Sequence, residues 1–269
     1  MTLATYLINL DGSDARLESA TRQLRAAGVE FTRVPAFDGR GLDVSQVADY
    51  DPRGAMRVMG RPLRGAEIGC YYSHLDCARR FLQGDAEHAL VLEDDMQLAP
   101  GTHGALGAML DWLGRNGVAW DIINVGARRA KYTSLLMGTG GHELLKAHYF
   151  PVRTTGIVWS RTGARAFVEG HRSITAPVDM FFRDWQCRTD RGLVVMPPLV
   201  TTTGAESEID DGGGDKRGHG GRSVLYGLIK QRRLLRNRLR AIRHRLRWRQ
   251  RARFSRNTGA GSPNGAPPA

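Results

Sequence analysis

Three consecutive acidic residues, Glu93, Asp94 and Asp95, follow directly after the apolar segment 90–92. Like charges at one spot repel each other unless a cation or a proton offsets them. Carboxylate oxygens suit Mg²⁺ and Mn²⁺, so the cluster predicts a divalent-metal site at the end of a buried strand. Because side chains alternate along a strand, we expect Glu93 and Asp95 to share the metal while Asp94 points to the other face. The simpler alternative is a solvated loop, since acids usually lie on surfaces.

The elements that must position this cluster alternate between strands and helices. Their order and short connections are typical of an α/β sheet with parallel strands. Residues 40–64 have weak periodicity and are expected to form an irregular loop, and the pattern of residues 127–147 is ambiguous. The expected strands are 5–10, 31–37, 90–93, 120–126, 148–152, 155–160 and 193–196, and the expected helices are 15–27, 65–82, 103–115, 162–169 and 180–187.

The net charge of +12 comes from one end of the chain of 269 residues. Residues 216–256 hold 16 Lys and Arg and no acidic residue, which leaves 23 basic and 27 acidic residues before position 216. The body is therefore slightly acidic, and its 41% hydrophobic content is sufficient for a sizeable core. The basicity thus characterises the C-terminal segment and gives no information about an active site.

The three cysteines, Cys70, Cys77 and Cys187, are too few and too scattered for a disulfide framework or a zinc site. Cys70 and Cys77 are seven residues apart, on one face of the expected helix, and we expect them to be buried core thiols. No charged-then-apolar leader and no apolar stretch of about 18 residues is present. Together with free thiols, this favours a cytoplasmic protein.

We expect four segments. Residues 1–202 form the catalytic domain, 203–222 a Gly-rich loop that acts as a lid or a linker, 223–256 a basic amphipathic helix, and 257–269 a disordered tail.

The basic helix has an apolar stripe among its arginines. Such a helix is typical of a membrane-surface element, because anionic headgroups attract Lys and Arg. RNA binding is the main alternative and an oligomerisation helix is the third; the stripe favours lipid, so we expect no nucleic-acid partner. The stripe consists of Val224, Leu225, Leu228, Leu235, Leu239, Ile242 and Leu246, with Trp248 and Phe254 as interfacial aromatics.

Several sequence blocks resemble glycosyltransferase family 25, the lipopolysaccharide and lipooligosaccharide sugar transferases related to collagen galactosyltransferases. The resemblance covers roughly residues 3–210, and the first three blocks occur in the order and spacing of the family. The blocks are Tyr6-Leu7-Ile8-Asn9-Leu10-Asp11 with Arg16 and Val34-Pro35-Ala36-Phe37-Asp38-Gly39; Gly65-Ala66-Glu67-Ile68-Gly69-Cys70 with Ser73-His74; Ala89 to Asp95; and the weaker Pro177-Val178-Asp179 and Glu206 to Ile209.

The resemblance implies a GT-A-like fold, a Rossmann-type mixed α/β sheet flanked by helices, here with the basic helix as an extension. It also implies an inverting enzyme that moves a sugar, commonly galactose, from a UDP-sugar to a lipopolysaccharide, glycolipid or oligosaccharide acceptor. Glu93-Asp94-Asp95 would be the metal-binding motif, with Mn²⁺ or Mg²⁺ stabilising the diphosphate leaving group. Such an enzyme would work as a peripheral protein on the inner face of the cytoplasmic membrane.

Inversion in one displacement needs a general base for the acceptor hydroxyl. Asp179, which matches an acidic position of the family, is our first candidate, and a helix N-cap is its alternative role. Glu208, with Glu206 beside it, is the rival base.

Other residues of the matched blocks are expected to bind substrate. Asn9 and Asp11 would meet the uridine and ribose, as ligands lie at strand ends in α/β folds. Arg16 would meet the pyrophosphate, or else pair with Glu18 or Asp14. Asp94 could contact the ribose or an arginine.

Ser73 and His74 lie in the middle of the expected helix, where a serine is poorly placed unless it is hydrogen-bonded. Both are expected at the substrate site because they belong to a family block, and a purely structural role is the alternative for each.

Two other functions remain possible from the sequence. A metal-dependent phosphohydrolase or nuclease could use the same acids, with the basic helix on nucleic acid, but it would need more metal ligands than Asp11 and Asp179 offer. A non-catalytic binding module is disfavoured because the acids are intact.

Overall fold

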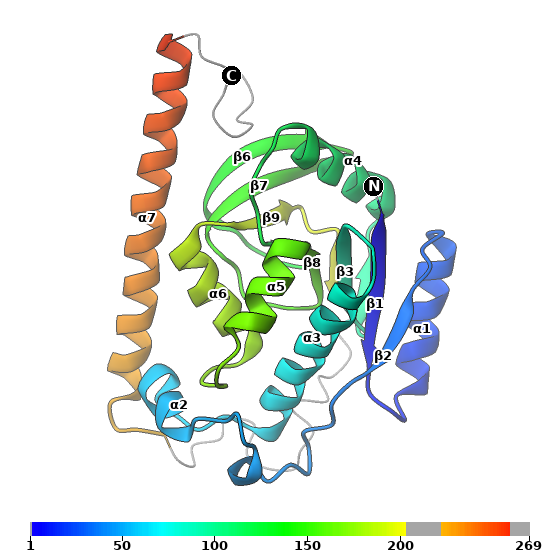
Figure 1. Ribbon diagram of the computed structural model, residues 1–269, viewed down its shortest axis with the longest axis vertical. Helices are drawn as coiled ribbons and strands as arrows, with labels where there is room; N and C mark the ends of the chain where they lie inside the picture. The colour runs from blue at the N-terminus through cyan, green and yellow to red at the C-terminus, as the bar shows by residue number, and fades with distance from the viewer. Residues whose placement is uncertain (1, 203–221, 259–269) are drawn as a thin grey trace.

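The computed structural model describes residues 2–202 and 222–258, the last six without their side chains. Its centre is a mixed eight-stranded sheet with the strand order β2-β1-β3-β8-β5-β9-β7-β6 (Figure 1). Its strands are β1 (Leu3–Asn9), β2 (Thr32–Pro35), β3 (His88–Glu93), β5 (Ile122–Asn124), β6 (Lys131–Thr139), β7 (His142–Tyr149), β8 (Gly156–Ser160) and β9 (Gly192–Met196). A smaller sheet pairs β4 (Met96–Leu98) with β10 (Val200–Thr202).

The first three strands of the chain are parallel, and their carboxyl ends lie together. Ile8 on β1 pairs with Glu93 on β3, and Asn9 pairs with Pro35 on β2. Strand β8 runs antiparallel between β3 and β5, which makes the sheet mixed. The acidic cluster that follows β3 is therefore placed beside the end of β1, where ligands commonly bind in open α/β sheets.

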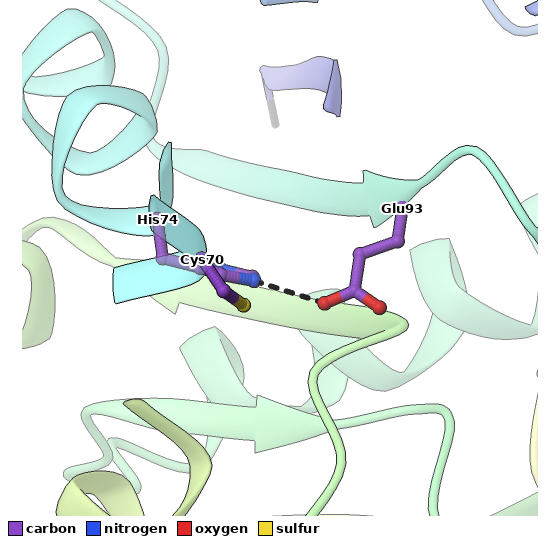
Figure 2. A group of neighbouring side chains, drawn as sticks. All are labelled: Cys70, His74 and Glu93. Carbon is purple, nitrogen blue, oxygen red and sulfur yellow. Dashed lines mark hydrogen bonds and ion pairs between the residues drawn. The ribbon is translucent and has the colours of Figure 1, made fainter. Parts of the chain in front are cut away.

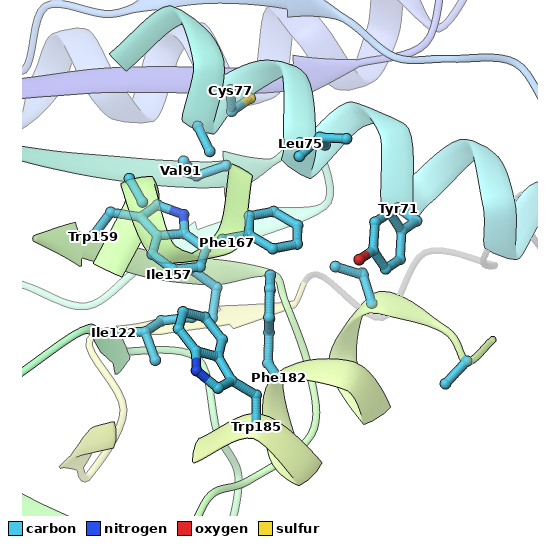
Figure 3. Close-up of a cluster of buried hydrophobic side chains, with 14 of the residues drawn as sticks. Tyr71, Leu75, Cys77, Val91, Ile122, Ile157, Trp159, Phe167, Phe182 and Trp185 are labelled. Carbon is cyan, nitrogen blue, oxygen red and sulfur yellow. The ribbon is translucent and has the colours of Figure 1, made fainter. Parts of the chain in front are cut away.

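Helices cover both faces of the sheet. Successive side chains of the strands point to opposite faces, so apolar residues on each face must be covered and two separate cores form. One core packs under α3 (Gly65–Gln83), α5 (Arg161–Gly170) and α6 (Val178–Thr189). Trp159, Phe167 and Phe182 form its centre, with the rings of Trp159 and Phe167 stacked at 5.4 Å (Figure 3). The other core packs under α1 (Asp14–Ala26) and α4 (Thr102–Arg115). These layers confirm the predicted α/β class.

Two local predictions are wrong. Residues 40–64 are not wholly irregular, because they contain a 3₁₀ turn (Val44–Gln46) and helix α2 (Pro52–Met59), whose N-terminus is capped by the Asp51 side chain. Two turns of helix are too short for a clear apolar repeat. Of the strand expected at 148–152, only residues 148–149 are strand, as the end of β7 in the β6–β7 hairpin, whose turn residues Gly140 and Gly141 both have positive φ.

Helix α7 (Tyr226–Thr258) packs along β6, β7, α2 and α6. Its buried positions are Asn237 and Ala241, whereas the side chains of Leu228, Leu235 and Leu239 are more than half exposed. The predicted apolar stripe thus faces away from the domain. Within the residues described, no helix is long and apolar enough to cross a membrane. The predicted linker 203–222, except for its last residue, and the predicted tail beyond residue 258 lie outside the described residues.

Candidate active site

A pocket opens at the carboxyl ends of β1 and β3, between the loop after β2 and helix α3. The end of β1 contributes Ile8 and Leu10, and the loop contributes Phe37 and Asp38. Six of the predicted site residues line this pocket: Arg16, Ser73, His74, Glu93, Asp94 and Asp95. The structure therefore brings together residues that are up to 79 positions apart in the sequence.

Three glycines allow the loop after β2 to lie directly on α3. A Cβ on Gly69 would come within 2.4 Å of the Phe37 carbonyl oxygen, and a Cβ on Gly39 within 2.0 Å of the Gly65 carbonyl oxygen. No side chain can occupy such a space, since the atoms in the way belong to the backbone. The glycines of the second sequence block are thus explained by this close approach, which forms one wall of the pocket.

Ser73 stabilises this contact between the loop after β2 and helix α3. Its hydroxyl donates to the Gly69 carbonyl at 2.8 Å and accepts from the Phe37 amide at 2.9 Å. Both hydrogen-bonding capacities are used, and the residue is buried. Ser73 lines the pocket, but these bonds assign it a positioning role for the loop.

Glu93 is held by two partners. His74 Nε2 lies 3.2 Å from Glu93 Oε1 (Figure 2). The hydroxyl of Thr154 donates to the same oxygen at 2.6 Å. Burial alone would raise the pKa of Glu93, but these two hydrogen bonds and the charge of Arg153 outweigh burial, so its pKa lies below the usual value. Glu93 is therefore an ionised carboxylate, and His74 is the donor.

Asp94 is held from the opposite side. The Asn9 side-chain amide donates to Asp94 Oδ2 at 2.7 Å, and Arg16 Nη1 lies 3.5 Å from Asp94 Oδ1. Asn9 also donates to the Ser13 carbonyl and accepts from Arg33. Because its amide is engaged on every side and buried, Asn9 positions Asp94 in this structure, and Arg16 pairs with Asp94 rather than with Glu18 or Asp14.

Asp95 differs from its two neighbours. Its Oδ1 atom is buried and has no hydrogen-bond partner among the described residues. Burial and the charges of Glu93 and Asp94 raise its pKa to about 6, although Arg16 and Arg153 partly offset them. An orphaned carboxylate oxygen among other carboxylates fits a divalent cation, because a cation satisfies the oxygen and removes the repulsion.

The expected strand alternation does not direct these three acids. Strand β3 ends at Glu93, and Asp94 and Asp95 lie in the turn that follows. Polar neighbours instead hold the side chains of Glu93 and Asp94. The three therefore share one pocket, but in this structure only Asp95 has an uncommitted buried oxygen.

Asp179 lies in the first turn of α6, and its N-cap is Pro177, so the alternative role of Asp179 as the cap residue is wrong. Its Oδ1 accepts from the Met180 amide at 2.6 Å. Burial raises its pKa, and Glu67 and Glu93 act in the same direction. A carboxyl with a raised pKa near the acidic cluster has the property that a general base needs.

Of the predicted residues that the structure describes, Asn9, Asp11 and Asp179 do not line the pocket. The side chain of Asp11 is largely exposed and pairs with Arg33. Glu208, with its neighbour Glu206, lies outside the described residues.

The structure adds residues that the sequence did not single out. Thr154 binds Glu93, and Arg153, with φ 104°, places a buried Nη1 atom that has no partner among the described residues. Asn124 supports this loop by donating to the Arg153 carbonyl at 2.7 Å. No sequence pattern links these residues to β3. Cys70, expected to be a buried core thiol, is partly buried and packs against the core under α3, but it also lines the pocket.

A pocket at the carboxyl ends of parallel strands is typical of an α/β protein that binds a ligand. Comparisons with known proteins identify the family within this class. The sequence model of "Glycosyltransferase family 25 (LPS biosynthesis protein)" matches residues 2–182. A glycosyltransferase 25 family member of Anopheles gambiae is 30% identical over 182 residues, covering 65% of this chain and 30% of the relative. Procollagen galactosyltransferase 2 of Homo sapiens is 26% identical over 181 residues, covering 65% and 29%.

The chain belongs to glycosyltransferase family 25, and it spans about 30% of the length of these relatives. Among solved structures, a glycosyltransferase involved in glycosylation of the major capsid of PBCV-1 aligns with a TM-score of 0.40 and 9% identity, over 77% of this chain and 95% of that one. A galactosyltransferase in complex with donor and acceptor sugar analogues aligns with a TM-score of 0.34 and 16% identity, over 74% and 86%. The family predicted from the sequence blocks is confirmed.

Proposed function

We propose that this protein is a metal-dependent inverting glycosyltransferase that moves a sugar from a UDP-sugar to a lipopolysaccharide, lipooligosaccharide or other surface-glycan acceptor. Galactose is the first donor sugar to test, because family relatives carry the name galactosyltransferase. Family membership and the acidic pocket at the strand ends support the proposal.

The observation that carries the metal dependence is the buried, unpartnered Oδ1 of Asp95. Mn²⁺ or Mg²⁺ bound there would supply charge to stabilise a departing diphosphate. Asp95 would be the primary ligand. Glu93 was also expected to be a ligand; His74 and Thr154 both bind its Oε1, so Oε2 is the atom that would reach the same ion.

The other residues of the chain have separate tasks in this proposal. Arg16 and Arg153 place positive charge near the acids, where a diphosphate would need it. Asp179 takes the proton of the acceptor hydroxyl, since its raised pKa improves a carboxylate as a base. Asn9, Ser73 and His74 position the groups that meet the substrate, through the bonds described above.

A donor screen with purified protein tests the enzyme and its metal together. We expect UDP release from one UDP-sugar in the presence of Mn²⁺ and an oligosaccharide acceptor, and loss of that activity with a chelator. Asp95→Asn should remove turnover, whereas Asp111→Asn, at an exposed acid on α4, should retain it. Full activity of Asp95→Asn, or of the chelated enzyme, would refute the metal role. Phosphate or nucleotide release without sugar transfer would instead support the phosphohydrolase alternative.

The base is tested by comparing Asp179→Asn with Glu208→Gln. Loss of the base should lower kcat about 100- to 10,000-fold and leave the KM for the donor almost unchanged. We expect this result for Asp179→Asn, because burial raises the pKa of Asp179 and the charge of Glu93 acts in the same direction. The same loss in Glu208→Gln alone would assign the base to Glu208.

We also propose that α7 attaches the enzyme to an anionic membrane surface, placing it at the inner face of the cytoplasmic membrane. The support is an exposed apolar stripe that includes Leu235, Leu239 and Leu246, more than half exposed, on a helix without a single acidic residue. Monomeric proteins seldom expose such a stripe without a partner. A second copy of α7 would bring arginines against arginines, so charge favours an anionic surface.

Vesicle binding tests this attachment without removing the helix, which also packs against the domain. Leu235→Ser combined with Leu239→Ser should weaken binding to phosphatidylglycerol vesicles and leave turnover on a soluble acceptor unchanged. The control is Gln231→Ser, an exposed position on α7 itself. Apolar residues of the domain, such as Leu17 and Val29, cannot serve as controls because they pack against the core. Equal vesicle binding by the double variant, or binding to RNA that exceeds binding to vesicles, would overturn the lipid assignment.

A further inference from the structure

Cys70, His74 and Glu93 place three different metal-ligating atoms next to one another. Cys70 and His74 are four residues apart on one face of α3, and Glu93 comes from the end of β3 (Figure 2). One ligand atom from each side chain lies within 4.8 Å of the other two, and in the described part of the chain this combination occurs once. The oxygen site at Asp95 uses neither the thiol nor the imidazole of this group.

We propose that Cys70, His74 and Glu93 form a binding site for a thiophilic divalent cation of the zinc class, distinct from the oxygen site at Asp95. Sulfur, imidazole nitrogen and carboxylate oxygen are the donors that zinc combines in proteins. Mg²⁺ and Mn²⁺ prefer oxygen ligands and gain little from a thiolate. The two neighbouring sites therefore differ in the kind of ion that each selects.

The geometry needs only a small closure around the ion. Zinc bonds of about 2.0–2.3 Å place tetrahedral ligand atoms roughly 3.3–3.8 Å apart. His74 Nε2 and Glu93 Oε1 are already 3.2 Å apart, so the remaining shift, of roughly 1 Å, falls on Cys70. Thr154 can keep its hydrogen bond to Glu93 and orient the carboxylate as an outer-shell partner.

Binding displaces two protons, and each has a destination. Zinc takes Cys70 as the thiolate, so the thiol proton leaves to solvent through the pocket that Cys70 lines. At His74 the proton moves from Nε2 to Nδ1, which has no hydrogen-bond partner among the described residues. The imidazole thus remains neutral and ligates through Nε2.

Three protein ligands leave a fourth zinc position free. Cys70, His74 and Glu93 all line the same pocket as Asp95, so that fourth position faces the pocket and not the core. A water molecule or a small anionic ligand from the pocket can complete the tetrahedron, as in zinc sites with three protein ligands.

Cobalt binding tests the proposal, because Co²⁺ replaces zinc and shows a thiolate charge-transfer band in the near ultraviolet when sulfur is a ligand. We expect this band in the full-length wild-type protein with one Co²⁺ per chain, displaced by Zn²⁺ but not by Mg²⁺. Cys70→Ala should lose the band, whereas Cys77→Ala, seven residues further along α3 and fully buried, should keep it. A wild-type protein without the band, or a band that survives in Cys70→Ala, would overturn the proposal.

X-ray absorption of the zinc-loaded wild-type protein covers the case in which Cys70→Ala does not fold. One sulfur and at least one imidazole nitrogen around the zinc would support the site. A zinc shell made of oxygen and nitrogen alone would refute it. Neither measurement depends on sugar transfer, so the result stands apart from the proposed enzymatic function.

Discussion

Helix α3 turns its large apolar side chains toward the sheet, whereas helix α7 turns its leucines toward solvent. Ile68, Tyr71 and Leu75 are buried on α3. On α7 the buried positions are Asn237 and Ala241, and Leu239 is 55% exposed. Both helices pack on the same domain, and both have apolar residues at helical spacing.

The difference shows that an apolar stripe identifies a helical face without identifying what covers it. The contacts that attach α7 to the domain are largely polar. Arg236 and Arg240 pair with Asp184, and Arg233 donates to the Val58 carbonyl at 2.9 Å. Trp248, expected among the interfacial aromatics, instead packs toward the domain, with its ring 6.2 Å from that of His148.

The largest expected effect comes from shortening one leucine on each helix. Leu75→Ala should lower the free energy of unfolding by about 2–5 kcal/mol, because it removes a fully buried side chain. Leu239→Ala should change it by less than about 0.5 kcal/mol, because its side chain is already mostly in water. Denaturant unfolding measures both; similar losses in the two variants would contradict the observed orientation of α7.

Substituting alanine for two helical glycines compares the cost of a steric clash with the gain in helix propensity. Gly69→Ala on α3 should destabilise the protein by about 1–3 kcal/mol, since a Cβ would meet the Phe37 carbonyl. Gly104→Ala on α4 should stabilise it by about 0.5–1 kcal/mol, because nothing lies within 4 Å of a Cβ at that position. Thermal unfolding of the two variants should therefore shift in opposite directions, and a stabilised Gly69→Ala would disprove the tight contact.

The two helices also border opposite charges, acids beside α3 and arginines along α7. A pKa of Asp95 raised to about 6, from 3.8, means that the folded protein binds this proton more tightly than the unfolded chain. Its contribution to stability is therefore present below about pH 4 and is lost as the pH rises through 6. Without divalent metal, Asp95→Asn should be more stable than wild type by about 1 kcal/mol at pH 8, after solvent screening.

The same comparison at pH 4 supplies the control, because Asp95 is then protonated in the folded state and still about half protonated in the unfolded chain, so most of the gain should be absent. Thermal midpoints in a chelating buffer measure it. A gain that is equal at pH 4 and pH 8 would show that repulsion among the acids is not its origin.

The smallest expected effect concerns the ion pairs that hold α7. Asp184→Asn should cost about 0.5–1 kcal/mol at low ionic strength and less in 1 M salt, and it should speed amide exchange in α7. Asp76→Asn, which removes the pair with Arg80 within α3, provides the matched control and should leave exchange in α7 unchanged. Unaltered exchange in Asp184→Asn would mean that other contacts hold the helix.

The fold class, the position of the acidic cluster and helix α3 could be predicted because each depends on local signals. The apolar repeat of α3 is visible in the sequence and predicts the helix. The acids after the apolar run that ends at Leu92 are also visible, and they predict that a strand ends there. The partners of the acids could not be predicted in the same way. Thr154 reaches Glu93 across 61 residues, and the loop that carries it has no motif.

The site also shows where a local rule fails. Alternation would have put Glu93 and Asp95 on one face, but it applies only while the backbone remains a strand, and β3 ends at Glu93. At the last strand position His74 holds Glu93, and beyond it Asn9 holds Asp94. Cys70 shows the same limit, because helical spacing places it on the face of Cys77 without indicating that a pocket opens beside it.

The ion pairs of Asp184 with Arg236 and Arg240 have a geometric consequence for the whole molecule. They hold the long helix against α6, and in this structure they fix its direction relative to the sheet. Any surface that captures the outward leucines would then set the tilt of the entire catalytic body. Every captured molecule would aim its pocket in the same direction, and the height of that opening above the surface would limit which acceptors come within reach.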